Sequence, residues 1–513
     1  MVSLFSEPIS KFPFHPFLIG FFFVISLFYN NIRVLNFDEI LIPLIIVLGI
    51  ITSIWILINL IVKNNLKSSL ILSLVLILFF SYGHIYLEID HFTINEFDIG
   101  KHRFLLIPFF SMFILGTILL IRTKKILDNT TLITNTIFLV LVVIVLVNIQ
   151  LYYFENPSYF YLNQNIESNT ISNNINTFPN IYFIVLDGYP GYRSLELSHQ
   201  NDGEFFNYFK NNGFFVSENS FSNYQVTHLS VPSTLNLDYL HPLAEIKDGV
   251  YDQRDFHLLG NDNKLMNFLK SNGYLIVNFD SSWSFSRDMK HADLQLCGDN
   301  QFLNSEFLIM LTKTSMLNPV YTKAFENDLV ELRLCAFDQI LDIDKRVSEP
   351  FFVFSHMYMP HPPYLFGPNG EILSPDELDL IAYSPEKQSA YFDQVKFLNK
   401  KIPQIVNNLL DSENPPIIVI QSDHGSAFLM GEDDTNWKHP DNNMLLERMN
   451  IINFIYLPDS PDILYDEITP VNTFRIILNH YFGTNFEILN DNSYIFNGTD
   501  FEDVTIKLKN IEN

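Results

Sequence analysis

Hydrophobic residues form long, nearly uninterrupted runs in the first third of the chain. Charged residues fall almost only between these runs, and no run alternates an apolar with a polar face. Each run approaches the about 20 residues that cross a bilayer as a helix. The pattern therefore predicts a five-span membrane domain over 1–155, with five buried helices of a soluble protein as the disfavoured alternative. The runs are 12–29, 40–62, 68–89, 104–121 and 131–152.

The pattern changes after residue 155. An Asn- and Ser-rich stretch at 156–179 is typical of a linker, and from residue 180 short apolar runs recur at intervals long enough for crossover helices. This spacing predicts an α/β domain over 180–513 whose central, mostly parallel sheet lies between helices. The segment 326–345 combines helical periodicity with mixed charge, which predicts an ordinary solvated helix. The predicted strands are 181–186, 274–279, 351–354, 417–420 and 451–456.

Charge divides the chain at the same place. Residues 1–155 carry nine acidic and nine basic side chains, so the net charge of −26 belongs to the remainder. A surface this acidic repels phosphate backbones, which excludes nucleic acid as a partner.

The basic residues of the loops predict the orientation in the membrane. If the N-terminus is cytoplasmic, six basic residues lie on the inner side and three on the outer side, which is the favoured distribution. Five spans then place the C-terminal domain outside the cytoplasmic membrane. The inner set is Lys11, Lys63, Lys67, Arg122, Lys124 and Lys125, and the outer set is Arg33, Lys101 and Arg103.

Two cysteines, Cys297 and Cys335, lie in the domain predicted to be outside the cytoplasm. Exported domains permit disulfides, so we expect a bridge, with two buried free thiols as the alternative. His84, near the outer end of the third apolar run, is expected to be buried and hydrogen-bonded, with contact to a lipid head group as the alternative.

The stretch PPIIVIQSDHG at 415–425 carries the first candidate chemistry. Its apolar, mostly β-branched residues predict a buried strand that ends in Asp423 and His424, and open α/β sheets place their sites at such carboxyl ends. A carboxylate beside an imidazole suits Zn²⁺ or Mn²⁺, although a site needs further ligands.

Three other segments offer candidates for convergence on that ion. IYFIVLDGYPG is a strand that ends in Asp187, and NYQVTHLSVPSTLN contains Thr227 at a loop-to-helix junction. The alternative for each residue is a purely structural role, as a helix cap or a turn residue. In FFVFSHMYMPHPPYLF a strand is followed by His356 and His361, and the alternative for each is a structural role only. His439 follows the Asp-His pair and is otherwise an exposed loop residue.

Together these segments resemble the alkaline phosphatase superfamily in its sulfatase-like branch. The likeness covers residues 180 to about 458 and is closest to the membrane-anchored phosphoethanolamine transferases and the lipoteichoic acid synthases. In such proteins a strand-end acid, a threonine nucleophile and an Asp-His pair bind one metal ion. The resemblance implies that Thr227 is the nucleophile, that His361 and His439 contact substrate, and that one divalent ion, Zn²⁺ or Mn²⁺, is bound. The implied metal ligands are Asp187, Thr227, Asp423 and His424.

Two departures separate the chain from sulfatases proper. Those enzymes use a Cys or Ser that is oxidised to formylglycine, two residues before a Pro and followed by Ser-Arg. Here Ser230 keeps the spacing, but Thr234 stands where Arg is expected, which makes Ser230 only the second candidate nucleophile. Asp187 is followed by Gly188 where sulfatases commonly show paired aspartates, and a single acid fits a one-metal site better than their Ca²⁺ site.

The expected function is therefore that of a membrane-anchored transferase. It would move a phosphoryl-linked head group, of the phosphoethanolamine or phosphoglycerol type, from a phospholipid donor to a surface glycan or lipid acceptor through a phospho-threonine. A membrane-anchored hydrolase of phosphate or sulfate esters is the first alternative. A protein that keeps the fold without catalysis is the second, and the intact set of site residues counts against it.

Overall fold

The chain forms two compact units in the computed structural model. One comprises Met1–Pro157 and Phe302–Phe325, and the other comprises Ser158–Gln301 and Glu326–Asn513. The described residues are 12–89, 93–94, 97–98, 100–156, 178–200, 203–281, 285–287, 289–298, 306–348, 350–373, 383–431, 433–460 and 462–511. The predicted linker 156–179 lies almost wholly outside them. The domain limits 1–155 and 180–513 stay a prediction, and a short internal segment joins the N-terminal unit in the structure.

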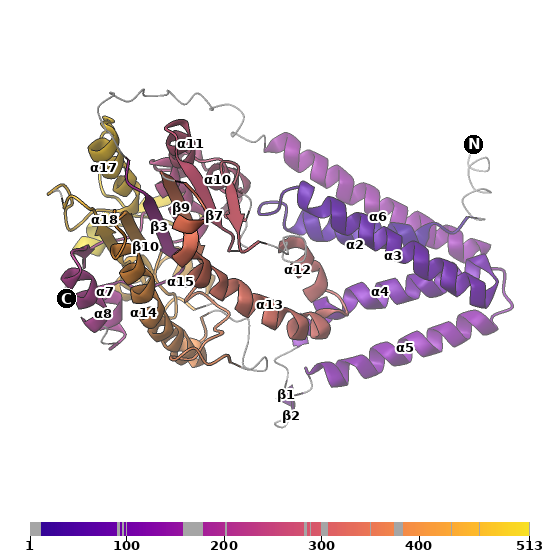
Figure 1. Cartoon of the computed structure of the whole chain (residues 1–513). Coiled ribbons are helices and arrows are strands. Elements are labelled where there is room, and N and C mark those ends of the chain that lie inside the picture. Colours follow the sequence, from indigo (N-terminus) through magenta and orange to yellow (C-terminus); the bar gives the residue numbers. More distant parts are fainter. Residues whose placement is uncertain are drawn as a thin grey trace. The chain divides into compact units, whose positions relative to one another are not determined.

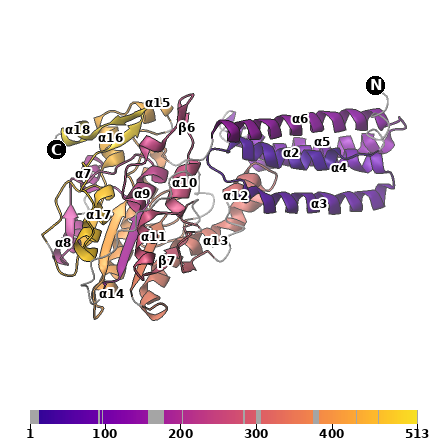
Figure 2. The same ribbon diagram turned by 90° about the horizontal axis from the view of Figure 1, so that it is seen from above.

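The first unit is a bundle of long apolar helices (Figures 1 and 2). Four described helices are long and apolar enough to cross a membrane, whereas α2 has only 16 residues, so the fifth predicted span stays a prediction. Large apolar side chains point outward, for example Ile61 and Leu119 at 81% and 70% exposure, which suits lipid and not a soluble core. The helices are α2 (His15–Asn30), α3 (Asp38–Val62), α4 (Asn65–Ile89), α5 (His102–Arg122) and α6 (Asp128–Glu155), with a short β1 (Thr93–Ile94) and β2 (Phe97–Asp98) before α5.

A helix from the middle of the chain, α12 (Glu306–Lys313), packs into the same bundle. Phe307 is fully buried there, and the backbone N–H of Met316 donates to the carbonyl of Phe79 on α4 at 2.9 Å. Gly83 permits this approach, because a Cβ on it would lie 2.3 Å from the carbonyl oxygen of Lys313. The prediction of a buried His84 is wrong: its side chain is exposed and lines a cavity of about 90 Å³ between α2, α4 and α12.

The second unit is built on a seven-stranded sheet in the order β4-β11-β10-β3-β9-β7-β8. Only β11 runs opposite to the other strands, which confirms a mostly parallel sheet. The five predicted strands are present, and β4 and β8 at the two edges escaped prediction because each has only three residues. The strands are β3 (Ile181–Leu186), β4 (Phe215–Ser217), β7 (Leu275–Phe279), β8 (Leu294–Leu296), β9 (Phe351–Met357), β10 (Ile417–Ser422) and β11 (Asn453–Tyr456).

Helices cover both faces of this sheet (Figure 1). Along β3, Tyr182, Ile184 and Leu186 belong to one core and Ile181, Phe183 and Val185 to the other, because side chains alternate across a strand. The first core is completed by α8 (Gly203–Asn211), α13 (Asn318–Gln339) and α14 (Gln388–Leu410), and the second by α9 (Thr227–Asn236), α11 (Lys264–Ser271) and α17 (Pro470–Phe482).

Shorter elements surround this framework. The remaining helices are α7 (Tyr192–Leu197), α10 (Arg254–Asn261), α15 (Asp434–Lys438), α16 (Asn442–Met449) and α18 (Thr505–Lys509), with 3-10 turns η2 (His241–Leu243), η3 (Ile340–Lys345) and η5 (Pro385–Lys387). Two hairpins pair β5 (Ile246–Lys247) with β6 (Val250–Tyr251) and β12 (Tyr494–Phe496) with β13 (Phe501–Asp503).

The helix predicted over 326–345 differs from expectation. It covers Asn318–Gln339, continues as η3, and is not simply solvated, because Val330, Arg333 and Phe337 are all buried. These positions recur at helical spacing, so the arginine belongs to the stripe that faces the core.

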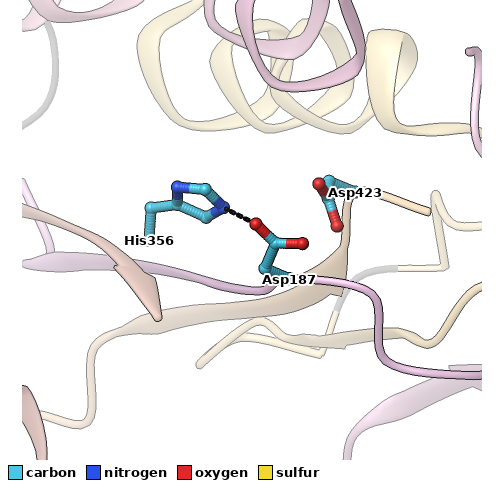
Figure 3. A group of neighbouring side chains, drawn as sticks. All are labelled: Asp187, His356 and Asp423. Atoms are coloured by element: carbon cyan, nitrogen blue, oxygen red, sulfur yellow. Dashed lines mark ion pairs between the residues drawn. The ribbon is translucent and has the colours of Figure 1, made fainter. Parts of the chain in front are cut away.

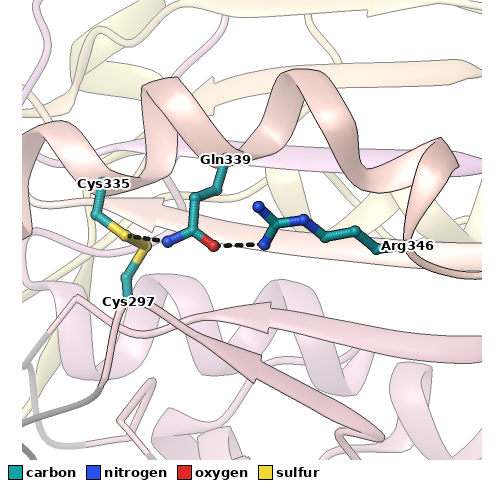
Figure 4. The surroundings of a disulfide bond; sticks show 4 residues. All are labelled: Cys297, Cys335, Gln339 and Arg346. Atoms are coloured by element: carbon teal, nitrogen blue, oxygen red, sulfur yellow. Dashed lines mark hydrogen bonds between the residues drawn. A yellow bond between two sulfur atoms is a disulfide. The ribbon is translucent and has the colours of Figure 1, made fainter.

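Cys297, which follows β8, and Cys335, on α13, form the expected disulfide (Figure 4). Gln339 packs beside it, with Nε2 at 3.0 Å from the sulfur of Cys335, and accepts a hydrogen bond from Arg346 at 2.8 Å. The bridge closes the chain segment that contains α12. It therefore ties together the two points at which the chain leaves and re-enters the α/β unit.

Candidate metal centre

Three neighbouring parallel strands end at one place in the middle of the sheet. Leu186 of β3 pairs with Ser422 of β10 on one side and with Met357 of β9 on the other. Asp187 and Asp423 come directly after their strands, and His356 lies one residue before the end of β9. The predicted convergence at the carboxyl ends of the strands is thus present.

Glycines beside the two aspartates let the loops turn tightly. Gly188 has φ of +71°, and its N–H donates to Oδ1 of Asp423 at 2.9 Å. A Cβ at Gly425 would lie 2.1 Å from the carbonyl oxygen of Glu447, so only glycine fits there. The two strand-end loops are therefore joined directly and held by close backbone packing.

The acidic and imidazole side chains gather within a few ångströms. Figure 3 shows Asp187 between His356 and Asp423, with the His356 imidazole pointing toward it. Nε2 of His356 lies 3.3 Å from Oδ2 of Asp187, and Nε2 of His424 lies 3.2 Å from Oδ2 of Asp423 and 4.0 Å from Oδ1 of Asp187. One ligand atom each from Asp187, His356 and Asp423 all fall within 4.8 Å of one another. His356 is thus a further candidate ligand, beside the set predicted from the sequence.

Thr227 is the first residue of α9 and reaches the same cluster. Its Oγ1 lies 2.9 Å from Nε2 of His424. Nδ1 of His424 lies 3.0 Å from the carbonyl oxygen of Gly425, which only accepts hydrogen bonds, so Nδ1 carries the proton and Nε2 presents a lone pair. Ser230 instead donates to the backbone carbonyl of Asp423 at 2.7 Å, which leaves Thr227 as the hydroxyl directed at the centre.

Burial dominates the electrostatics of the cluster. Neither carboxylate oxygen of Asp187 accepts a hydrogen bond from the described residues, and neither does Oδ2 of Asp423. Burial raises the pKa of Asp187, and burial together with the charge of Asp187 raises the pKa of Asp423 to about 7. Burial lowers the pKa of His356 to about 4 and that of His424 well below its usual value. Two buried carboxylates with free lone pairs beside neutral imidazoles fit a divalent cation.

The two histidines predicted to contact substrate lie in different surroundings. The backbone N–H of His361 donates to the carbonyl of Asp187 at 3.1 Å, and its Nδ1 lies 2.9 Å from the carbonyl of Pro362, so it stands beside the centre. Burial lowers the pKa of His361. His439 is the residue just after α15, and within the described residues no hydrogen bond or ion pair joins its ring to the cluster. Its role as a substrate contact stays a prediction.

Two arginines lie near the centre that the sequence did not predict there. Arg448 of α16 is buried and donates to the carbonyls of Gln225 and Gly425 at 2.7 and 2.9 Å, which ties the segment before Thr227 to the segment after His424. Arg333 of α13 lies with its guanidinium 4.1 Å from the ring centre of Tyr358. The position of Arg333 in an apolar helical stripe is the sequence signal that could have identified it. No local sequence signal identifies Arg448.

Residues 179–460 match the family model of the sulfatases, which is more than half of the chain. The chain belongs to the sulfatase family. The predicted sulfatase-like membership is therefore confirmed, as is the prediction of an enzyme that acts on phosphate or sulfate esters. No curated protein sequence matches the chain significantly.

Solved structures with a related fold are distant. The C-terminal periplasmic domain of EcEptC from Escherichia coli, in complex with Zn, is 12% identical, with 66% of this chain and 95% of that chain covered at a TM-score of 0.41. The integral membrane lipooligosaccharide phosphoethanolamine transferase A from Neisseria meningitidis is 11% identical, with 93% and 95% covered at a TM-score of 0.37. A phosphonate monoester hydrolase from Agrobacterium radiobacter is 10% identical, with 62% and 80% covered at a TM-score of 0.39. Similarities this distant assign no reaction to the chain.

Proposed function

We propose that this sulfatase-family protein is a membrane-anchored, metal-dependent transferase. It moves a phosphoryl-linked head group, of the phosphoethanolamine or phosphoglycerol type, from a phospholipid to a surface glycan or lipid through a phospho-threonine. The α/β unit lies outside the cytoplasm in this proposal. The distribution of basic residues between the apolar runs and the Cys297–Cys335 disulfide both support that location.

The observation that carries the proposal is the position of Thr227. Its hydroxyl is 2.9 Å from the lone-pair nitrogen of His424, at the N-terminus of a buried ten-residue helix. It lies beside the carboxylate of Asp187 and Oδ2 of Asp423, which accept no hydrogen bond from the described residues. A helix N-terminus favours negative charge, which develops on an attacking oxygen and on phosphoryl oxygens. No other hydroxyl in the described part of the cluster has this placement, since Ser230 is committed to a backbone carbonyl.

The ligands proposed for one divalent ion, Zn²⁺ or Mn²⁺, are Asp187, Thr227, Asp423 and His424. When bound, the ion would supply Lewis acidity and lower the pKa of the threonine hydroxyl. Oγ1 of Thr227 forms a bond to the phosphorus of the donor, its proton passes to solvent, and the bond from phosphorus to the diacylglycerol oxygen breaks. That oxygen takes up a proton as diacylglycerol leaves.

The second half of the reaction restores the threonine. An acceptor hydroxyl attacks the phosphorus and loses its proton, the bond from phosphorus to Oγ1 breaks, and Oγ1 takes up a proton to restore the hydroxyl. His361 is suited to move this proton, because its Nδ1–H is held by the Pro362 carbonyl and Nε2 of a neutral imidazole accepts one. In the proposal His361 and His439 also hydrogen-bond the head group.

A covalent adduct tests the proposal directly. The full chain in detergent, loaded with Zn²⁺ or Mn²⁺, is incubated with phosphatidylethanolamine or phosphatidylglycerol and then digested for mass spectrometry. We expect the head-group phosphate on the peptide that contains Thr227. Thr227→Val is isosteric and should carry no adduct, whereas Ser230→Ala should still be modified. An adduct on Ser230, or none with either lipid while metal is bound, would contradict the proposal.

The family itself favours a second function, hydrolysis of phosphate or sulfate esters. In that case water replaces the acceptor hydroxyl in the second step. Turnover of a generic phosphodiester or sulfate ester that is independent of any acceptor would favour the hydrolase. A product that retains the head group on a glycan or lipid acceptor would favour the transferase.

A further inference from the structure

Arg333 is a buried cation on the core-facing stripe of α13. Its side chain is only 7% exposed, and Val330 and Phe337, three residues before it and four after it, are buried on the same face. The guanidinium lies over the ring of Tyr358, 4.1 Å from the ring centre, in a cation–π contact. Tyr358 in turn contacts His361, with 4.3 Å between the ring centres and an angle of 36° between the ring planes.

In the part of the chain that the structure describes, the guanidinium contacts the ring of Tyr358 and has no hydrogen-bonded partner. Within the described residues no hydrogen bond or ion pair to Arg333 is present, and its Nε is buried without any acceptor. Arginine offers five N–H donors, and a buried charge that is neither paired nor hydrogen-bonded destabilises a folded protein. Arg448 shows the ordinary solution, because its guanidinium donates to the carbonyls of Gln225 and Gly425.

The same guanidinium stands beside the candidate metal centre. Tyr358, over which it lies, contacts the ring of His361, and the backbone N–H of His361 donates to the carbonyl of Asp187 at 3.1 Å. Among the described residues, the ion pairs of Asp187 are with His356 and His424, and neither of its oxygens accepts a hydrogen bond from Arg333. A divalent ion would be balanced by the carboxylates of Asp187 and Asp423, which leaves the charge of Arg333 to be met by something else.

We propose that Arg333 binds the phosphoryl oxygens of the substrate. A planar guanidinium pairs with a tetrahedral oxyanion through two parallel hydrogen bonds, and Tyr358 holds that plane in place. The role deepens the function proposed above and rests on it.

Binding of inorganic phosphate tests this role without any turnover. The full chain in detergent is loaded with Zn²⁺, its metal content is measured, and phosphate is titrated by calorimetry and by thermal unfolding. The variants are Arg333→Met, which keeps the length of the side chain without its charge, and Arg333→Lys, which keeps the charge without the fork. Arg346→Met is the matched control, because Arg346 lies away from the centre beside Gln339 and its removal changes the net charge equally.

We expect Arg333→Met to retain its zinc and to weaken phosphate binding by about tenfold or more. Without phosphate it should unfold at the same or a higher temperature than the native protein, because an unpaired buried charge is gone. The phosphate affinity of Arg333→Lys should lie between those of Arg333→Met and the native protein, and Arg346→Met should bind phosphate as the native protein does. Sulfate is titrated in parallel, and the effect of Arg333 on phosphate must be at least as large as its effect on sulfate.

Native phosphate affinity in zinc-loaded Arg333→Met would overturn the proposal. So would equal destabilisation of that variant with and without phosphate, which marks a structural arginine. If Arg333→Met does not fold, the phosphate affinity of Arg333→Lys is the test. Native affinity in Arg333→Lys would contradict the proposed pair of hydrogen bonds from the guanidinium. None of these results depends on head-group transfer, so failure here leaves the phospho-threonine experiment to judge the transferase separately.

Discussion

Two buried acids lie close to each other in the fold and have opposite surroundings. Glu447 of α16 is 1% exposed, and its carboxylate accepts hydrogen bonds from the Ser426 hydroxyl and from the N–H groups of Phe428 and Leu429. Asp187 is fully buried, and neither of its oxygens accepts one from the described residues. Burial alone therefore says little about function. A buried carboxylate with satisfied oxygens holds a loop, and one with free oxygens is prepared for a cation.

The two buried arginines repeat the contrast. Arg448 donates to two carbonyls and so fixes the loops that carry Thr227 and His424, whereas Arg333 makes only a ring contact within the described part of the chain. The helix of Arg333 is instead held through its neighbour Cys335. Groups that stabilise the unit and groups that we propose to bind a ligand are thus interleaved at one end of the sheet, and substitutions should separate them.

Asp187→Asn should give the largest effect. It should lower metal binding and activity without lowering the stability of the metal-free protein. The change removes a proposed metal ligand, so we expect loss of bound metal and a fall in activity of about three orders of magnitude or more. The metal-free variant should unfold at the same or a higher temperature than the metal-free native protein, because a buried carboxylate whose oxygens accept no hydrogen bond from the described residues is removed. Metal analysis, activity assays and thermal unfolding of the same preparation would show this.

The matched control for this variant is Asp393→Asn on α14. Asp393 is partly exposed, and among the described residues it pairs only with Lys396 one turn further along the helix, so its loss changes the net charge equally without touching the centre. That variant should keep metal and activity. If Asp187→Asn bound metal normally, or unfolded far below the native protein without metal, Asp187 would belong with Glu447 as a structural acid.

Removal of the disulfide should give the next largest effect, and on stability. The bridge closes a segment with a sequence separation of 38, and loop-closure entropy assigns about 4 kcal/mol to a cross-link of that length. Cys297→Ser with Cys335→Ser should lower the free energy of unfolding by up to this amount, measured by denaturant titration without reductant. Because α13 carries Arg333, phosphate affinity should fall as well, whereas metal content should not. Unchanged phosphate affinity would show that packing alone positions the helix.

Glu447→Ala should mainly destabilise. The change leaves the Ser426 hydroxyl and the N–H groups of Phe428 and Leu429 without their buried acceptor, which corresponds to about 3 kcal/mol. Glu447→Gln keeps one acceptor oxygen and should lose less. Denaturant unfolding of both variants in metal-free protein measures the difference. Full stability of Glu447→Ala would mean that water replaces the carboxylate, and the contrast with Asp187 would weaken.

The sequence predicts most residues of the candidate site, but not the tertiary contacts that hold them in place. Strand ends are legible because apolar runs stop at Asp187 and Asp423, and parallel strands bring those ends together. The hydroxyl of Thr227 was found through a motif. Arg448 lies 23 residues beyond Gly425 in an ordinary helix, and its role depends on carbonyls that only the tertiary fold brings near. Likewise, α12 joins the apolar bundle through a backbone approach at Gly83, and no periodicity reports such a contact.

The pH dependence of the metal-free protein should be the smallest effect and the most specific. Burial and the charge of Asp187 raise the pKa of Asp423 to about 7, whereas its usual value is 3.8. The folded state therefore holds a proton that the unfolded state has released, so the metal-free native protein loses stability as the pH rises from about 4 through about 7. Asp423→Asn cannot titrate and escapes this loss. In the presence of a chelator, the unfolding temperature of the native protein should fall relative to that of Asp423→Asn between about pH 4 and about pH 7. Histidine titration is common to both proteins and largely cancels in the difference. A gap that stays constant across this range would mean that Asp423 ionises normally and that its free oxygen is not prepared for a cation.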